Sequence, residues 1–144
     1  MFKISKHKKR SILKVLVLST IIRRGELHGY GIYRELTDMG MENWKPSIGS
    51  LYRTLHKLRE EGLIEDKEIM TKNRRKIRVY KATDKGINEF IQIAQNFINK
   101  VEIGLSIILP TLSRLKSNNI LKNQLSLLEN TLRNINSIIV KYLH

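Results

Sequence analysis

Three residues in the middle of the chain have types and spacing suited to contact with a polyanion. Gly49, Arg53 and Lys57 follow one another at steps of four, so on a helix they would share one line along its surface. A glycine lets the backbone approach closely, and a guanidinium can donate two hydrogen bonds to a guanine edge or a phosphate. A solvated helix with no partner can carry the same residues, and this segment alone leaves both interpretations open.

Polar neighbours extend this surface. The side chains expected to face base edges are Ser50, Arg53 and His56, and those expected to hold phosphates are Ser47, Tyr52 and Lys57. Base-edge contacts select a sequence, whereas phosphate contacts fix the register of a protein on the duplex. Residues 47–57 are therefore the candidate reading element.

Residues 72–76 form a second basic cluster. Its members are Lys72, Asn73, Arg74, Arg75 and Lys76, so four of the five residues are cationic. Packing like charges this closely costs energy unless an anion neutralises them, and a DNA backbone or minor groove would supply that anion. A basic N-terminal arm, Lys6 to Arg10, adds a third expected contact surface through Lys8, Lys9 and Arg10.

The overall charge agrees with a polyanionic partner. The 144 residues include 27 Lys and Arg against 13 Asp and Glu, which gives a formal net charge of +14. Residues 1–85 hold 21 of the basic and 10 of the acidic residues, so most of the excess lies there. DNA, RNA or an anionic membrane would suit this excess, and a basic surface that binds nothing is the alternative.

The elements that must position these residues follow from the spacing of apolar side chains. That spacing predicts a first helix over Arg10–Arg23, a short connection at 27–29 and a second helix over Tyr30–Thr37. Ser47 is a suitable N-cap for a third helix that ends near Gly62. The stripe expected to bury this helix consists of Ile48, Leu51, Leu55 and Leu58. Trp44 and Tyr80 are expected to anchor the same core.

After Gly62 the apolar period changes to alternation. Leu63–Met70 and Lys76–Ala82 are predicted to pair as a β-hairpin across the polar turn 71–75, which lacks the Asn-Gly or Asp-Gly pair of the tightest hairpins. Thr83 should cap a fourth helix, which Pro110 is expected to break or kink, and Asn118-Asn119 marks a second interruption. The predicted fold is mainly α with a small β-hairpin: a winged helix-turn-helix domain over 1–85 and a helical dimerisation region over 86–144.

The last helical stretch has the pattern of a coiled-coil seam. Its apolar residues are Leu121, Leu125, Leu128, Leu132, Ile135, Ile139 and Tyr142, in alternating steps of four and three. We expect region 86–144 to form a homodimer through this seam, together with Phe90 and Phe97 of the preceding helix. The alternative is that the seam packs against the fourth helix of its own chain, and we favour the homodimer because that packing would leave much apolar surface exposed.

Other chemistries find no support in the sequence. The chain has no cysteine, which excludes disulfides, thiol nucleophiles and cysteine-ligated zinc. His28 has no second ligand at metal-binding spacing, so a structural hydrogen bond at the start of the second helix is its favoured role. Glu60 and Glu61 are interpreted as a solvated helix end rather than a catalytic pair. Without a nucleophile elbow or a phosphate loop, we expect neither enzyme activity nor a cofactor.

Membrane insertion is not expected either. Lys14 interrupts the apolar stretch that follows Lys8-Lys9-Arg10, and Arg23-Arg24 follow it where a signal peptide would need small residues. No apolar run reaches the ~18 residues that would span a bilayer. We therefore expect a soluble, cytoplasmic protein.

Four motifs in order resemble the PadR family of transcriptional regulators. They are Leu27-His28-Gly29-Tyr30, Pro46-Ser47-Ile48-Gly49-Ser50-Leu51-Tyr52, Leu58-Arg59-Glu60-Glu61-Gly62-Leu63-Ile64 and Tyr80-Lys81-Ala82-Thr83. The resemblance covers about residues 11–90, and its most specific part is the Ser-x-Gly-x-Leu-Tyr run. It implies a homodimer that represses a nearby promoter and is often released by a small molecule. It also implies DNA contacts at Ser47, Gly49 and Tyr52 and in the wing, which is the hairpin.

Two features depart from the family pattern. Residues 71–76 contain neither the Gly nor the Pro that is common at the wing tip of this family, so the resemblance does not define the shape of the tip. Some members hold planar drugs between aromatic residues of their C-terminal helices. The last 50 residues contain only Phe97 and Tyr142 as aromatics, so such a cage is not expected here, and the resemblance names no effector.

These observations predict a sequence-specific regulator that binds double-stranded DNA, acting as a homodimeric repressor on an inverted-repeat operator. Two alternatives remain open. The first is a non-specific architectural protein that coats DNA, which the net charge would suit. The second is a ligand-sensing or protein-interaction module whose winged head does not bind DNA. A protection assay would distinguish the first by continuous coverage, and absence of duplex binding at low salt would favour the second.

Overall fold

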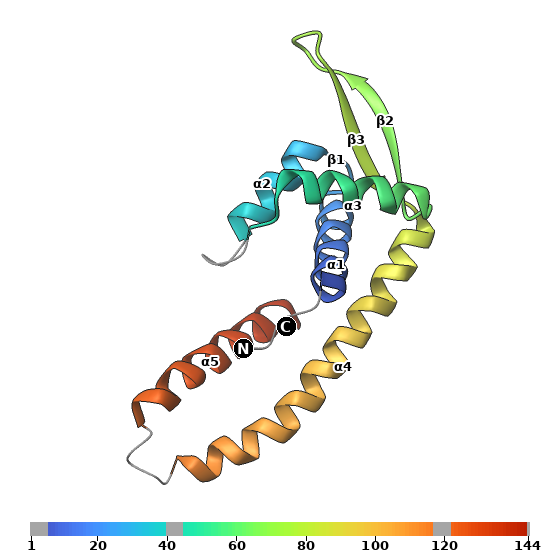
Figure 1. The fold of residues 1–144 in the computed structure, drawn as a ribbon. Coiled ribbons are helices and arrows are strands. Elements are labelled where there is room, and N and C mark those ends of the chain that lie inside the picture. The colour runs from blue at the N-terminus through green and yellow to red at the C-terminus, as the bar shows by residue number, and fades with distance from the viewer. Residues whose placement is uncertain (1–5, 40–44, 117–121, 144) are drawn as a thin grey trace. The chain divides into compact units, whose positions relative to one another are not determined.

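The computed structural model describes residues 6–39, 45–116 and 122–143 (Figure 1). Its elements in chain order are α1 (Lys6–Arg24), β1 (Leu27–His28), α2 (Gly29–Met39), α3 (Ile48–Glu60), β2 (Ile64–Met70), β3 (Lys76–Ala82), α4 (Asp84–Leu115) and α5 (Lys122–Leu143). The chain divides into two compact units, Met1–Asn96 and Phe97–His144, and the boundary falls within α4. We call the first unit the head and the second unit the tail.

The predicted fold class is confirmed: the chain is mainly helical, with a small antiparallel sheet in the head. The two long strands, β2 and β3, pair in a register that runs from Ile64↔Ala82 to Met70↔Lys76. They project from the helices of the head as a hairpin (Figure 1), which we call the wing. The order of three helices followed by this hairpin is that of a winged helix-turn-helix.

The sheet has a third strand that sequence reasoning missed. Leu27 and His28, predicted as a plain connection, form β1 and pair antiparallel with Tyr80 and Val79 of β3. The strand order is therefore β1-β3-β2. Two residues are too few to show an alternating pattern, so this strand exists only because the edge of β3 offers it backbone partners.

The core of the head lies between α1, α2, α3 and the sheet. Its members exposed by less than 2% include Val17, Leu18, Ile21, Ile32, Leu51, Leu55, Leu58 and Ile64. Tyr80 joins this cluster from β3, as predicted. The predicted stripe of α3 is confirmed at Leu51, Leu55 and Leu58, which fixes the rotation of α3 about its axis. Trp44 lies outside the described residues.

The fourth residue of the predicted stripe, Ile48, is wrongly assigned to the core. Its side chain is 48% exposed, whereas Leu51 and Leu55 are almost fully buried. Ile48 is the first residue of α3, one turn before the helix meets the core. Ile48 precedes Leu51 by three residues, which fits the helical spacing of the apolar stripe. That spacing alone does not indicate which end of the stripe lies outside the core. Ile48 is therefore an exposed residue at the N-terminal end of α3.

A half-buried carboxylate, that of Glu35, holds α2 to the end of α1. Glu35 accepts hydrogen bonds from Arg23, at 3.0 Å, and from Arg24. Burial tends to raise the pKa of Glu35, but the two guanidinium groups outweigh it, and the pKa lies below its ordinary value. The carboxylate is therefore held in its charged form, and this pairing holds α2 against the C-terminal end of α1.

The junction between α3, the wing and α4 is packed without spare space. Gly62 has φ +72°, a conformation that favours glycine, and it ends α3. The Thr83 hydroxyl donates to the Gly62 carbonyl at 2.7 Å and accepts from the Gly86 amide at 3.0 Å, so Thr83 caps α4 as predicted. A Cβ on Gly86 would lie 1.9 Å from the carbonyl oxygen of Leu63. Only glycine fits at position 86.

Replacing Gly86 by alanine should therefore destabilise the head. The added methyl must displace the backbone at the base of the wing, and overpacking of this kind costs about 3 kcal/mol. Urea unfolding followed by circular dichroism would measure the loss. Gly104→Ala is the matched control, because nothing lies within 4 Å of a Cβ on Gly104 in the helical tail segment. It should stabilise slightly, by about 0.5–1 kcal/mol, and equal stability of both variants would contradict this packing.

The tail contains the second part of α4 and all of α5. Of the break or kink predicted at Pro110, the break is wrong, because α4 continues through Pro110 to Leu115. Pro110 and Ser106 are both exposed, so water can bond the Ser106 carbonyl that lacks its helical donor. The predicted interruption at Asn118-Asn119 and the seam residue Leu121 lie outside the described residues. The described seam residues lie on α5, between Lys122 and Leu143.

Candidate nucleic-acid interface

The N-terminal turn of α3 carries a chain of hydrogen bonds that ends at Arg53. The Ser47 hydroxyl caps the helix by accepting from the Ser50 amide at 3.1 Å and donates to the Ser50 hydroxyl at 2.8 Å. Arg53 Nη2 donates to the same Ser50 hydroxyl at 3.1 Å. The guanidinium is thereby turned toward the N-terminal end of α3, where residues of a recognition helix meet base edges.

Gly49 lies next to this guanidinium. A Cβ on Gly49 would lie 3.5 Å from Arg53 Nη1, and both residues are exposed. The structure therefore brings together four of the predicted contact residues, Ser47, Gly49, Ser50 and Arg53, on one open face. Of these, Ser50 is half-buried and the others are exposed. The N–H donors of the Arg53 guanidinium therefore lie next to Gly49, where no side chain covers the backbone.

Tyr52 has a packing role that its sequence position does not reveal. A Cβ on Gly29 would lie 2.9 Å from the Tyr52 hydroxyl and 3.0 Å from the ring, so the tyrosine lies directly on the backbone at the start of α2. Tyr52 is nevertheless 44% exposed. The contact packs α3 against the start of α2, and the exposed part of the ring remains available to a partner.

The C-terminal end of α3 is less positive than its sequence suggests. His56 lies 3.1 Å from a Glu60 oxygen and 3.3 Å from Arg59 Nη2. Lys57 lies 4.0 Å from Glu61, which also pairs with Lys14 of α1 at 3.1 Å. Arg59 pairs with Asp66 of β2 at 3.3 Å and so ties α3 to the wing. His56 and Lys57 are exposed as expected, but acidic side chains share their surroundings, and the unneutralised charge of α3 is centred on Arg53.

The wing tip has a defined conformation despite its lack of Gly and Pro. The Arg74 amide donates to the Thr71 carbonyl and the Thr71 amide to the Arg75 carbonyl, both at 2.9 Å. Arg74 has φ 58°, the left-handed conformation that hairpins of this loop length place after a type I turn. The Thr71 hydroxyl accepts from the Arg75 amide at 3.2 Å and braces the turn. An arginine thus occupies the position where glycine is usual.

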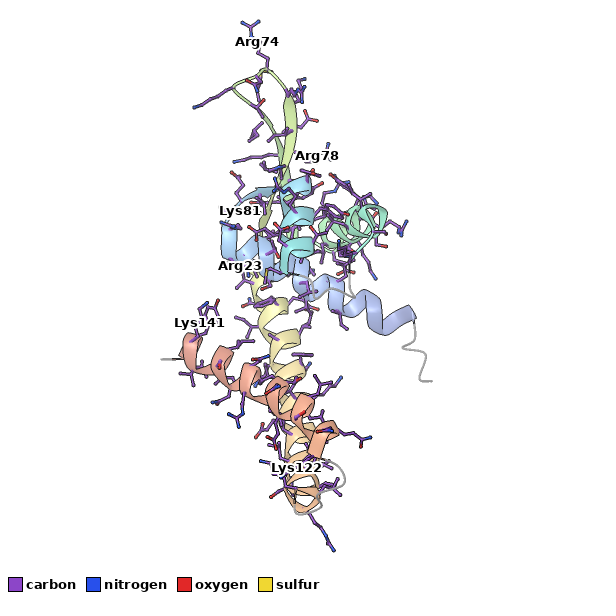
Figure 2. The ribbon with its side chains drawn as sticks, turned by 90° about the vertical axis from the view of Figure 1, so that its left-hand side faces the viewer. Arg23, Arg74, Arg78, Lys81, Lys122 and Lys141 are labelled. Carbon is purple, nitrogen blue, oxygen red and sulfur yellow. The ribbon has the colours of Figure 1, made fainter. Side chains whose placement is uncertain are left out.

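The cations of the wing divide into two groups. Two of the strand cations are paired: Arg78 lies 2.9 Å from Asp66, and Lys67 lies 2.8 Å from Glu26. Lys81 of β3 is exposed and has no ion pair among the described residues. The tip residues Lys72, Arg74, Arg75 and Lys76 are all exposed and have no ion pair among the described residues. Figure 2 shows Arg74 at the far end of the hairpin, with Arg78 and Lys81 nearer the helices. Four of the five unpaired cations in this part of the structure, Lys72 and Arg74 to Lys76, therefore lie at the wing tip.

The basic segment at the N-terminus is helical. Lys8, Lys9 and Arg10 lie in the first turns of α1, which begins at Lys6 rather than at the predicted Arg10. A separate arm preceding the helix is thus replaced by an extension of α1. The side chains of these three residues lie outside the described part, so their contact with DNA stays a prediction.

His28 does not form the expected structural hydrogen bond among the described residues. It belongs to β1, and its ring lies against Gly31, where a Cβ would be 3.0 Å from His28 Cε1. The described residues also contain no cluster of three or more His, Cys, Asp or Glu that could hold a metal ion. His28 is best understood as a packing residue between β1 and α2.

Comparisons with known proteins agree with this geometry. The family model described as "Transcriptional regulator PadR-like family" matches residues 17–92, which span α1 to the first part of α4. A PadR-like transcriptional regulator from Bacillus cereus is 25% identical, with a TM-score of 0.59 over 72% of this chain and 97% of its own. The comparison with curated protein sequences gave no match.

Two further solved structures share the fold at lower identity. A transcriptional regulator from Clostridium thermocellum is 20% identical, with a TM-score of 0.60 over 70% of this chain and 94% of its own. A PadR family transcription regulator from Clostridium difficile is 17% identical, with a TM-score of 0.55 over 67% of this chain and 97% of its own. No helix in the described residues is both long and apolar enough to cross a membrane.

Proposed function

The chain belongs to the PadR-like family of transcriptional regulators, and on this premise we propose that it is a homodimeric repressor that binds an inverted-repeat DNA operator. The observation that carries the proposal is the Ser47–Ser50–Arg53 chain at the exposed N-terminal end of α3. It presents an oriented guanidinium on a face without bulk, on the same head as four unneutralised wing-tip cations. Action on DNA places the protein in the cytoplasm, which is part of the proposal.

In the proposed mechanism, one set of residues contacts the bases of the DNA and another set contacts its phosphates. The N-terminal end of α3 enters the major groove, where Arg53 donates two hydrogen bonds to a guanine and Ser50 and His56 reach neighbouring bases. The wing tip, Tyr52, Lys57 and the start of α1 hold phosphates. Binding of cations to phosphates releases counterions, so affinity should fall steeply with salt. The α3 helix selects the sequence, and the flanking cations supply most of the affinity.

The homodimer is proposed from the apolar surface of the tail. Within this unit, Phe97 is 59%, Ile107 66% and Leu128 47% exposed, far more apolar surface than a soluble unit usually leaves open. A second copy of the chain would cover it through the predicted seam. The described members of that proposed interface are Phe97, Leu128, Leu132, Ile135 and Ile139. Leu125, also expected in the seam, is already buried within the single chain, so it is not available to a second copy. Phe90 packs against the core of its own head, and we leave it out of the interface.

Arg53→Ala and Arg74→Ala should have different effects on DNA binding. Loss of the base contact should cost about 1–3 kcal/mol for the preferred base and remove the preference at that position. Loss of the tip cation should weaken binding to all sequences alike and lower the salt slope by about 1 per site. Titration of both variants against every single-base variant of one bound duplex would measure this. If the two variants had identical base preferences, the assignment of a base contact to Arg53 and a phosphate contact to Arg74 would be contradicted.

A further inference from the structure

An exposed apolar side chain stands at the reading end of α3. Ile48 is 48% exposed although isoleucine is among the residues most often buried. It immediately follows the capping Ser47 and precedes Gly49, which has no side chain to shield it. Neither the packing of the head nor the hydrogen bonds of Ser47, Ser50 and Arg53 explain a β-branched hydrocarbon at this position.

The surroundings of Ile48 indicate a particular occupant. The polar chain that ends at Arg53 Nη2 begins at its neighbour Ser47, so Ile48 lies at the same end of α3 as groups suited to a polyanion with hydrogen-bonding edges. A lipid tail or an apolar protein surface would leave those polar groups without partners. In the major groove of DNA one hydrocarbon group lies among donors and acceptors at every A·T pair: the C5-methyl group of thymine.

We propose that Ile48 reads a thymine through its C5-methyl group and is a specificity-determining residue of the chain. The inference rests on the proposed function, because it needs α3 in the major groove. First-turn residues of a recognition helix approach the bases closely, and contact between the isoleucine and the methyl group would remove both from water. Burial of a single methyl-sized group changes affinity roughly four-fold. Each half-site should then contain a thymine whose methyl group matters.

The test replaces thymine by deoxyuridine, which removes the methyl group and leaves all base-pair hydrogen bonds. A bound duplex is first obtained from a random pool with the full-length protein. Each thymine is then replaced in turn, and affinities are measured for the wild type, for Ile48→Ala and for Ile87→Ala. Ile87 is a suitable control, because it is 37% exposed and lies in the first turn of α4, which begins near the opposite, C-terminal end of α3 (Figure 1).

For the wild type and Ile87→Ala, uracil at one thymine of each half-site should weaken binding roughly four-fold. For Ile48→Ala the same replacement should have no effect, while urea unfolding stays unchanged because the residue is exposed. Equal sensitivity of Ile48→Ala and wild type at every thymine would overturn the inference and leave the proposed function standing. A loss of stability in Ile48→Ala with uniformly weaker binding would overturn it too, since Ile48 would then be a core residue. Failure to recover any bound duplex would contradict the proposed function itself.

Discussion

Replacing Lys72, Arg74, Arg75 and Lys76 together by glutamine should weaken binding to duplex DNA roughly 1,000-fold at 0.15 M salt. A dimer would lose eight cations, and this estimate counts half of them as phosphate contacts. The tip residues have no ion pair among the described residues, so nothing in the described protein already neutralises them. The slope of log affinity against log salt should become shallower by about 3–4. Titrations at several salt concentrations would measure both quantities.

The control for this variant removes equal charge elsewhere. Lys100, Lys122, Arg133 and Lys141 are exposed residues of the tail, and their replacement by glutamine lowers the net charge by the same four units. If general attraction between a basic protein and DNA dominates, the two variants should weaken binding equally, which would contradict a role for the wing. If the wing holds the backbone, only the tip variant should change the salt slope.

Charging the α5 seam should separate the dimer. Leu128 and Ile139 are each 47% exposed in the single chain, so glutamates at both positions are tolerated by a monomer. In the proposed dimer the same carboxylates would be buried next to apolar side chains, which costs several kcal/mol. Sedimentation should therefore show a monomer for Leu128→Glu/Ile139→Glu. Affinity for an inverted repeat should fall by about 100-fold or more, because two half-sites are no longer bound by one linked unit.

Asn130→Glu and Asn134→Glu form the matched control on the opposite face of α5. Both positions are exposed, and their helical phase places them away from the seam. This variant should remain dimeric and bind DNA with only the small loss expected from added negative charge. A seam variant that stays dimeric in sedimentation would show that the seam packs within its own chain or that another surface joins the copies.

Much of the head could be predicted from the sequence because its signals are local. Ser47 as N-cap, Gly62 as helix end and Thr83 as the next cap each depend on residues within one turn, and all three have the predicted role. The leucine stripe of α3 can be recognised because its apolar residues recur at helical spacing. The strands of the wing can be recognised because apolar and polar residues alternate along them. The Ser47–Ser50–Arg53 chain could also have been found, because steps of three place these side chains above one another on a helix.

The features that the sequence did not reveal depend on contacts between distant residues. Strand β1 is defined by its pairing with Val79 and Tyr80, and two residues cannot display that pairing in advance. The exposure of Ile48 depends on where the core ends, and the left-handed Arg74 depends on the register of the whole hairpin. The neutralisation of Arg78 by Asp66 likewise requires both strands to be in place. The sequence therefore identifies the basic cluster at the tip, but it cannot show which cations of the strands are neutralised by acidic neighbours.

The most direct test of the central claim is selection of bound duplexes from a random pool by the full-length wild-type protein. If α3 reads DNA and two heads act together, the selected sequences should share an inverted repeat. The half-site centres should lie about 34 Å apart, one turn of B-DNA, because two α3 helices must enter successive major grooves. We expect enrichment of such a repeat, which would support sequence-specific binding by a dimer. Duplexes that bind at low salt but share no sequence would contradict it, and the protein would then be a non-specific DNA-coating protein.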